Sequence, residues 1–160
     1  MKSSEVRAAV SARGKKFVII SARFYANLAD WLEDGARRAL AACDVSESDI
    51  TVYHVPGCFE LPLAASRAIA ASKFDGVVAL GAVIRGETPH FDFVAGECAR
   101  GIMSVQLATG TPIGFGVLTT ETAAQAEERA DPKRGDKGYE AAMAAVAVLA
   151  IGNRPLDRVS

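Results

Sequence analysis

Residues that build metal sites and disulfides are scarce in this chain of 160 residues. It contains two histidines and three cysteines, and no two cysteines form a C-x-x-C pair. Because so few metal ligands are available, we expect no metal site. The three thiols, Cys43, Cys58 and Cys98, are odd in number, which favours reduced, mostly buried cysteines in a cytoplasmic protein.

An excess of one charge and long apolar runs are also missing. The 18 basic and 19 acidic residues give a formal net charge of −1, which is not the footprint of a nucleic-acid binder. Apolar runs such as residues 76–84 are far too short to span a bilayer, which takes about 20 apolar residues. Residues 1–16 are polar and do not resemble a signal peptide. We therefore expect neither nucleic-acid nor membrane partners.

The chain instead alternates short apolar runs with segments of helical periodicity. Strands are predicted at residues 17–21, 50–55, 76–84 and 112–118. Helices are predicted at residues 28–43, 60–72, 88–108 and 139–151. A further short helix is predicted to follow a cap at Thr119 or Thr120 and to end at Arg129. This order predicts an α/β fold: a three-layer α-β-α arrangement with a four-stranded parallel sheet, flavodoxin-like. We expect residues 1–16 to be a flexible N-terminal segment and residues 17–160 to form a single domain.

Each predicted strand is followed by a loop with aromatic, polar or charged side chains. These loops are residues 23–25, 57–60, 85–90 and 119–121. In an open α/β sheet, ligands bind beyond the carboxyl ends of the strands, and parallel strands bring those ends to one edge. The sequence therefore predicts a small-molecule site at this edge.

His90 is the candidate for proton transfer within that site. Thr88 followed by Pro89 matches a helix N-cap and a proline at the first helical position, so His90 would lie in the first turn. Free backbone N–H groups and the helix dipole make this a place for an anion, particularly phosphate. An ordinary capping or surface histidine is an equally open interpretation. His54, within a predicted strand, is expected to be structural.

Nucleotide-binding motifs are incomplete or missing. Gly81 and Gly86 have the glycine spacing of a P-loop, but Glu87-Thr88 follows where Lys and Ser or Thr are required. An acid there would repel phosphates, which excludes nucleotide hydrolysis. No G-x-G-x-x-G follows the first strand, so dinucleotide binding is not expected.

Six stretches of the sequence match one enzyme family in order and spacing, across residues 17–151. They are Arg23-Phe24, residues 55–63 (VPGCFELPL), residues 81–92 (GAVIRGETPHFD), residues 115–121 (FGVLTTE), residues 125–130 (QAEERA) and residues 135–138 (GDKG). On these motifs the chain resembles the lumazine synthases of riboflavin biosynthesis. The resemblance implies condensation of 5-amino-6-(D-ribitylamino)uracil with 3,4-dihydroxy-2-butanone 4-phosphate. The products would be 6,7-dimethyl-8-ribityllumazine, phosphate and water, and no cofactor is needed.

The resemblance also implies roles for individual residues. His90 would move protons and Phe24 would stack on the pyrimidine. The other implied substrate contacts are Cys58 and Glu60 at the ribityl chain, Val83 and Ile84 at the pyrimidine edge, and Gly86, Glu87 and Thr88 at the phosphate. Gly57 and Ala82 are also implied as substrate-binding residues. Phe115 and Arg129 would come from a neighbouring subunit, with Arg129 on the phosphate and Lys137 as a supporting cation. Read from the sequence alone, Phe24, Glu60, Arg129 and Lys137 each also have a purely structural interpretation.

A homo-oligomer is implied as well, because members of the family are homopentamers, some of which assemble into icosahedral shells of 60 subunits. Three alternatives stay open at this stage. They are an archaeal-type riboflavin synthase, a non-catalytic shell protein that binds flavin or lumazine, and a flavodoxin-like electron carrier.

Overall fold

A four-stranded parallel sheet forms the centre of the computed structural model, which describes residues 10–153. Its strands are β1 (Phe17–Ala22), β2 (Ile50–Val55), β3 (Gly76–Ile84) and β4 (Ile113–Thr120), and their order across the sheet is β2-β1-β3-β4. The inner strands β1 and β3 are almost wholly buried, because helices cover both faces. The outer strand β2 is half-buried to exposed.

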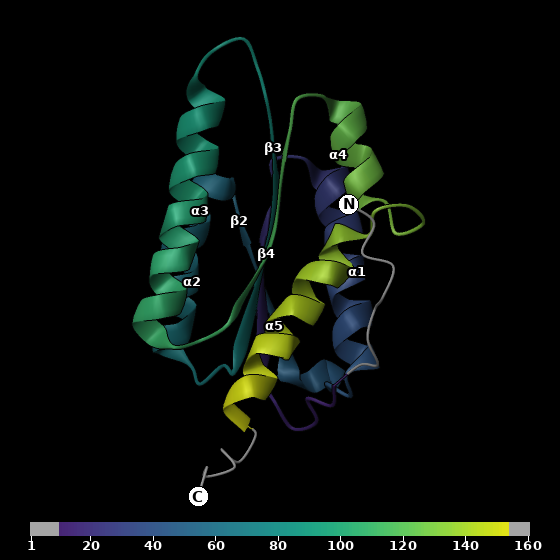
Figure 1. Cartoon of the computed structure of the whole chain (residues 1–160), viewed down its shortest axis with the longest axis vertical. Helices are drawn as coiled ribbons and strands as arrows, with labels where there is room; N and C mark the ends of the chain where they lie inside the picture. Colours follow the sequence, from purple (N-terminus) through teal and green to yellow (C-terminus); the bar gives the residue numbers. More distant parts are fainter. Residues whose placement is uncertain (1–9, 154–160) are drawn as a thin grey trace, which may run out of the picture.

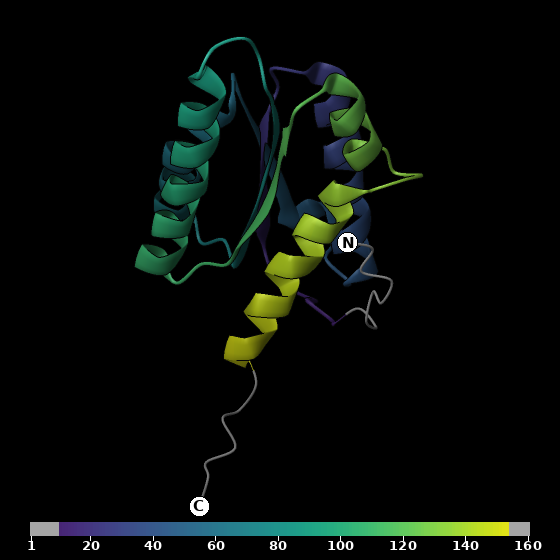
Figure 2. The same cartoon turned by 45° about the horizontal axis from the view of Figure 1, so that its top comes forward.

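Helices cover the sheet on two sides, and the three-layer flavodoxin-like prediction is confirmed (Figures 1 and 2). One face carries α1 (Ala26–Ala42), α4 (Ala123–Ala130) and α5 (Lys137–Asn153), and the other carries α2 (Leu61–Ala71) and α3 (His90–Thr109). Two short 3-10 turns, η1 (Glu47–Asp49) and η2 (Cys58–Glu60), flank β2. Among the described residues, no helix is long and apolar enough to cross a membrane.

Two apolar cores result from the alternation of side chains along the strands. In β1, Phe17 and Ile19 join the core beneath α1 and α5, whereas Val18 and Ile20 join the core beneath α2 and α3. Glycine allows α5 to lie very close to its neighbours: a methyl group at Gly138 would overlap the Leu32 carbonyl of α1. The tight contact between α1 and α5 therefore depends on a position without a side chain.

Two helix starts differ from their predicted positions. The helix predicted to start at Thr88 begins at His90, because Pro89 has backbone angles of φ −70° and ψ 4° and lies outside it. Neither Thr119 nor Thr120 caps α4; Thr122 does, and its side chain accepts a hydrogen bond from the backbone N–H of Gln125 at 3.2 Å. In both cases the predicted helix exists but starts a few residues later.

The N-terminal segment is described only from Val10 onwards. Residues 1–9, the greater part of the segment predicted to be flexible, lie outside the described residues. Ala12 is buried against the core, and its backbone N–H donates to the Cys43 carbonyl at 2.7 Å. The end of the segment therefore packs against the end of α1.

Candidate active site

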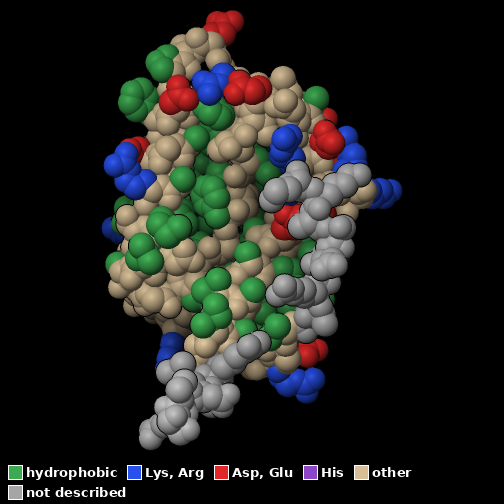
Figure 3. Space-filling view, in the orientation of Figure 1, with side chains coloured by type: hydrophobic (Ala, Val, Ile, Leu, Met, Phe, Trp, Pro, Cys, Tyr) green, Lys and Arg blue, Asp and Glu red, His purple; other side chains and the backbone are tan. Residues whose placement is uncertain are grey.

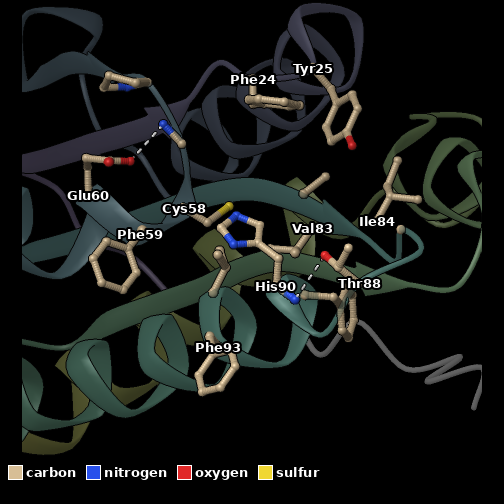
Figure 4. Close-up of a pocket in the computed structure, with 16 residues that line it drawn as sticks. Phe24, Tyr25, Cys58, Phe59, Glu60, Val83, Ile84, Thr88, His90 and Phe93 are labelled. Carbon is tan, nitrogen blue, oxygen red and sulfur yellow. Dashed lines mark hydrogen bonds between the residues drawn. The ribbon is translucent and has the colours of Figure 1, made fainter.

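A pocket of about 730 Å³ lies at the carboxyl ends of β1, β2 and β3, within the size range of small-molecule sites. It occupies the place where the strand order reverses, between β1 and β3, which is the usual ligand position in open α/β sheets. The predicted convergence of loops is confirmed for the loops after these three strands (Figure 4). The lining residues are Phe24, Tyr25, Pro56, Gly57, Cys58, Phe59, Glu60, Ala82, Val83, Ile84, Gly86, Thr88, His90, Phe91, Phe93 and Val94.

Two aromatic rings after β1 form one wall of the pocket. Phe24 is 74% exposed although it follows a fully buried strand. Its ring packs edge-on against the ring of Tyr25, with 4.9 Å between the two ring centroids. The preceding Arg23 is anchored to α1 by ion pairs with Asp30 at 2.8 Å and Glu33 at 3.0 Å. An exposed ring on an anchored backbone is suited to stacking on a flat heterocycle.

The loop after β2 contributes a buried thiol and a carboxylate. Cys58 is 4% exposed, and burial, with a smaller contribution from nearby Cys98, raises the pKa of its thiol to about 12. The thiol is therefore protonated at neutral pH and unsuited to act as a nucleophile. The side chain of Glu60 accepts a hydrogen bond from the backbone N–H of Gly57 at 3.1 Å, which fixes the loop (Figure 4).

The end of β3 offers unpaired backbone to the pocket. β3 pairs with β1 only as far as Leu80, whereas it pairs with β4 as far as Ile84. Within the described part of the chain, no strand lies against residues 82–84 on the β1 side. Ala82, Val83 and Ile84 line the pocket there, and the Cys58 thiol lies against the Ala82 backbone. Main-chain groups of Val83 and Ile84 are therefore the ones available to the polar rim of a ligand.

His90 opens α3 and faces the aromatic wall from the other side of the pocket. Figure 4 shows its imidazole extending into the pocket, opposite Phe24 and Tyr25. Its backbone N–H lies 3.5 Å from the hydroxyl oxygen of Thr88, so Thr88 still faces the helix start although it is not the cap residue. The positive end of the α3 dipole, with Gly86 and Thr88 beside it, favours an anion next to an ionisable ring.

Four residues predicted for the site lie outside this pocket. Glu87 is exposed between Gly86 and Thr88 and does not line it. Phe115, on the outer strand β4, is 43% exposed. Arg129 is exposed on α4, where its guanidinium donates to the Gln125 carbonyl at 3.1 Å. Lys137 begins α5 and pairs with Glu140 at 2.8 Å. Glu87 is close to His90 in the chain but outside the pocket, whereas a single chain does not bring Phe115, Arg129 or Lys137 into the pocket with His90.

Six lining residues were not among the predicted site residues: Tyr25, Pro56, Phe59, Phe91, Phe93 and Val94. The last two lie three and four residues after His90, so they share its face of the helix. That spacing was a usable signal for Phe93 and Val94. Tyr25, Pro56, Phe59 and Phe91 adjoin predicted residues in the sequence, but nothing in their local pattern says that they face the ligand space.

The open parallel sheet and the largely apolar pocket at its switch point define a flavodoxin-like α/β protein with a small-molecule site. Comparison with known proteins makes the class more specific. The family model described as 6,7-dimethyl-8-ribityllumazine synthase matches residues 14–152. The chain therefore belongs to the 6,7-dimethyl-8-ribityllumazine synthase family.

Two relatives agree with this family over almost their whole length. A Desulfotalea psychrophila protein named 6,7-dimethyl-8-ribityllumazine synthase is 51% identical over 137 residues, which are 86% of this chain and 88% of that protein. A Chlorobium luteolum protein of the same name is 44% identical over 149 residues, which are 93% of this chain and 96% of that protein.

Proposed function

We propose that the protein condenses 5-amino-6-(D-ribitylamino)uracil with 3,4-dihydroxy-2-butanone 4-phosphate to form 6,7-dimethyl-8-ribityllumazine, phosphate and water. The observation that carries the proposal is the pocket itself. In a chain of this family, one pocket combines an exposed aromatic wall, an unpaired strand edge and an imidazole at a helix start. These features suit a flat pyrimidine, its polar edge and a proton transfer beside phosphate.

The pyrimidine and its ribityl chain occupy the part of the pocket between β1 and β3 in this proposal. Phe24 stacks on the ring, while the backbone at Val83 and Ile84 bonds to its edge, with Ala82 alongside. The ribityl hydroxyls contact Glu60 and the backbone of Gly57 and Cys58. Because the Cys58 thiol is buried and protonated, its contribution is shape and main-chain hydrogen bonds rather than covalent chemistry.

The phosphate of the second substrate binds at the loop before α3. Backbone N–H groups of Gly86, Glu87 and Thr88 hold it at the positive end of the helix dipole, and the Glu87 side chain points away. Arg129 of a neighbouring subunit adds a bidentate partner, with Phe115 of that subunit beside it and Lys137 as a supporting cation. Both Phe115 and Arg129 are exposed in the single chain, as this arrangement requires.

The reaction consists of imine formation, elimination of phosphate and ring closure. Each step moves protons, and none needs oxidation or a metal ion. His90 is the group for these transfers, because its ring extends into the pocket beside the proposed phosphate position.

A homopentamer is part of the proposal, and twelve pentamers assembled as a 60-subunit shell are its larger form. Exposed apolar residues on the face between α3 and α5 support association (Figure 3). They are Met103 and Leu107 on α3, Phe115 on β4, and Val148 and Ile151 on α5. A closed ring of heterologous contacts would cover such a face and complete each site. The three unpaired thiols support a cytoplasmic location.

Steady-state kinetics with both substrates test the proposal. Lumazine, followed by its absorbance, and inorganic phosphate should appear in a one-to-one ratio and faster than in the uncatalysed mixture. Omission of either substrate should abolish both signals. A background rate from folded, oligomeric protein would contradict the proposal. Conversion of lumazine alone to riboflavin would instead indicate the archaeal-type riboflavin synthase.

A further inference from the structure

Arg85, the first residue after β3, contacts three side chains from two other segments beside the pocket, the first turn of α3 and the residue after β4. Its Nε lies 2.8 Å from a carboxylate oxygen of Glu121, which follows β4. Its Nη2 lies 3.3 Å from a carboxylate oxygen of Asp92 in the first turn of α3. Its guanidinium carbon lies 4.3 Å from the centre of the Phe91 ring. None of these contacts is with a residue of the same loop.

These contacts join the two ends of the loop that carries the proposed phosphate site. The loop leaves β3 at Arg85 and enters α3 at His90, with Gly86 and Thr88 between them on the pocket wall. The Arg85 backbone N–H also donates to the Thr120 carbonyl at 2.9 Å, so main chain and side chain hold it to the end of β4. One side chain thus links the end of β3 to the first turn of α3 and to the residue after β4.

An isolated ion pair on the surface contributes little to the stability of the fold, and the Arg85 side chain is 38% exposed. The arrangement here differs because one planar guanidinium serves two carboxylates from different elements and also stacks on Phe91. A lysine ammonium provides neither the fork nor the flat face. The geometry therefore constrains relative position more than it adds stability.

Arg85 also neutralises negative charge around the loop. Glu87, Asp92 and Glu121 gather near the loop, and Figure 3 shows acidic and basic side chains side by side at this end of the molecule. Arg85 balances Asp92 and Glu121 directly. Without it, uncompensated carboxylates would oppose a phosphorylated ligand across a short distance.

We propose that Arg85 is a positioning residue that holds the β3–α3 loop in the conformation that receives the phosphorylated substrate and places His90. This inference rests on the proposed function, because it assigns the loop to that substrate. It adds a residue to the site that does not line the pocket and acts through Phe91, Asp92 and Glu121.

The test compares Arg85→Met, Arg85→Lys and a matched control, Arg37→Met. Arg37 is equally exposed, at 39%, but pairs with Glu47 away from the pocket. Arg85→Met should raise the KM for the phosphorylated butanone about tenfold or more while the KM for the pyrimidine changes less than about twofold. Arg85→Lys should reverse only part of this increase in KM, since lysine restores the positive charge but not the paired N–H donors of a planar guanidinium. Arg37→Met should match the wild type.

Hydrogen exchange of the backbone amides at residues 86–92 gives a readout independent of turnover. Exchange there should be faster in Arg85→Met than in the wild type or Arg37→Met. Three results would each overturn the positioning role: an equal rise in KM for both substrates in Arg85→Met, a wild-type KM in Arg85→Lys, or unchanged hydrogen exchange at residues 86–92. Inactivity of the wild type would overturn the proposed reaction instead, and the exchange result would still decide whether Arg85 holds the loop.

Discussion

Among the side chains that line the pocket, those able to exchange protons are the His90 imidazole, the Tyr25 phenol, the Glu60 carboxylate and the Cys58 thiol. Most neighbours of His90 in the pocket, including Phe91, Phe93 and Val94, are apolar, and the buried Cys58 thiol stays protonated. Glu60 is bonded to the backbone of its own loop. The proposed reaction assigns proton transfer to His90, the imidazole at the start of α3.

Replacing His90 with alanine should lower kcat by about 10²- to 10⁴-fold, the usual contribution of a positioned acid or base. The KM values should change far less, because the aromatic wall and strand edge remain. The matched control is His54→Gln, which changes the other histidine; its side chain pairs with Glu33 at 3.1 Å outside the pocket. Equal rates in the two variants would remove His90 from the mechanism.

The buried thiols predict a loss of stability at high pH. Burial raises the pKa of Cys58 to about 12 and that of Cys98 to about 11 from an ordinary value near 9. The folded state thus favours the neutral thiols, and this stability is fully present below pH 9. It is lost as the pH rises from about 9 towards 12, where the unfolded thiols ionise first.

Urea unfolding at pH 8 and pH 10.5 measures this effect in wild type and Cys58→Ala. The variant should be less stable at pH 8, because it leaves a small cavity. Its further decline between the two pH values should be smaller than that of the wild type. Identical declines would show that Cys58 does not contribute to the alkaline loss.

At the scale of elements, strands were easier to predict than helix ends. The predicted strands at residues 50–55 and 76–84 match β2 and β3 residue for residue. A continuous apolar run marks β3 as a buried strand, whereas β2 is marked by β-branched and aromatic residues that stop at Pro56-Gly57. The start of α3 was placed too early because Thr88-Pro89 resembles a cap, whereas the backbone angles of Pro89 exclude it from the helix. Such angles depend on how the loop closes over the sheet, which local pattern does not specify.

The contact between α1 and α5 gives a prediction for one element pair. Gly138→Ala should lower the free energy of unfolding by about 1–3 kcal/mol, since its methyl group would overlap the backbone of Leu32. Gly96→Ala is the matched control on the exposed face of α3, with open space around it. It should raise that free energy by about 1 kcal/mol through helix propensity. Similar midpoints for both variants in denaturant would contradict the close contact.

For the whole molecule, the pocket of a single chain contains ten of the fourteen predicted site residues. Phe115, Arg129 and Lys137 lie on β4, α4 and α5, and none of them lines it. In the proposed pentamer, a second copy of the chain supplies Phe115 and Arg129. A subunit without neighbours would therefore be incomplete as a catalyst.

Mixing inactive subunits tests this sharing. His90→Ala and Arg129→Ala variants, each close to inactive alone, should regain part of the activity when dissociated together and reassembled. Some interfaces would then combine an intact His90 with an intact Arg129. The control is each variant reassembled alone, which should stay inactive. No recovery in pentamers shown by mass spectrometry to be mixed would exclude a shared site.

The sequence by itself determined the order of elements, the burial of β1 and β3 and the loops that line the pocket. These follow from periodicity and from the rule that parallel strands end at one edge. Only the tertiary structure decided that Phe24 is exposed, that the end of β3 lacks a partner on one side, and that Arg85 reaches Asp92 and Glu121. These features depend on distances between segments far apart in the chain, and local sequence patterns do not encode such distances.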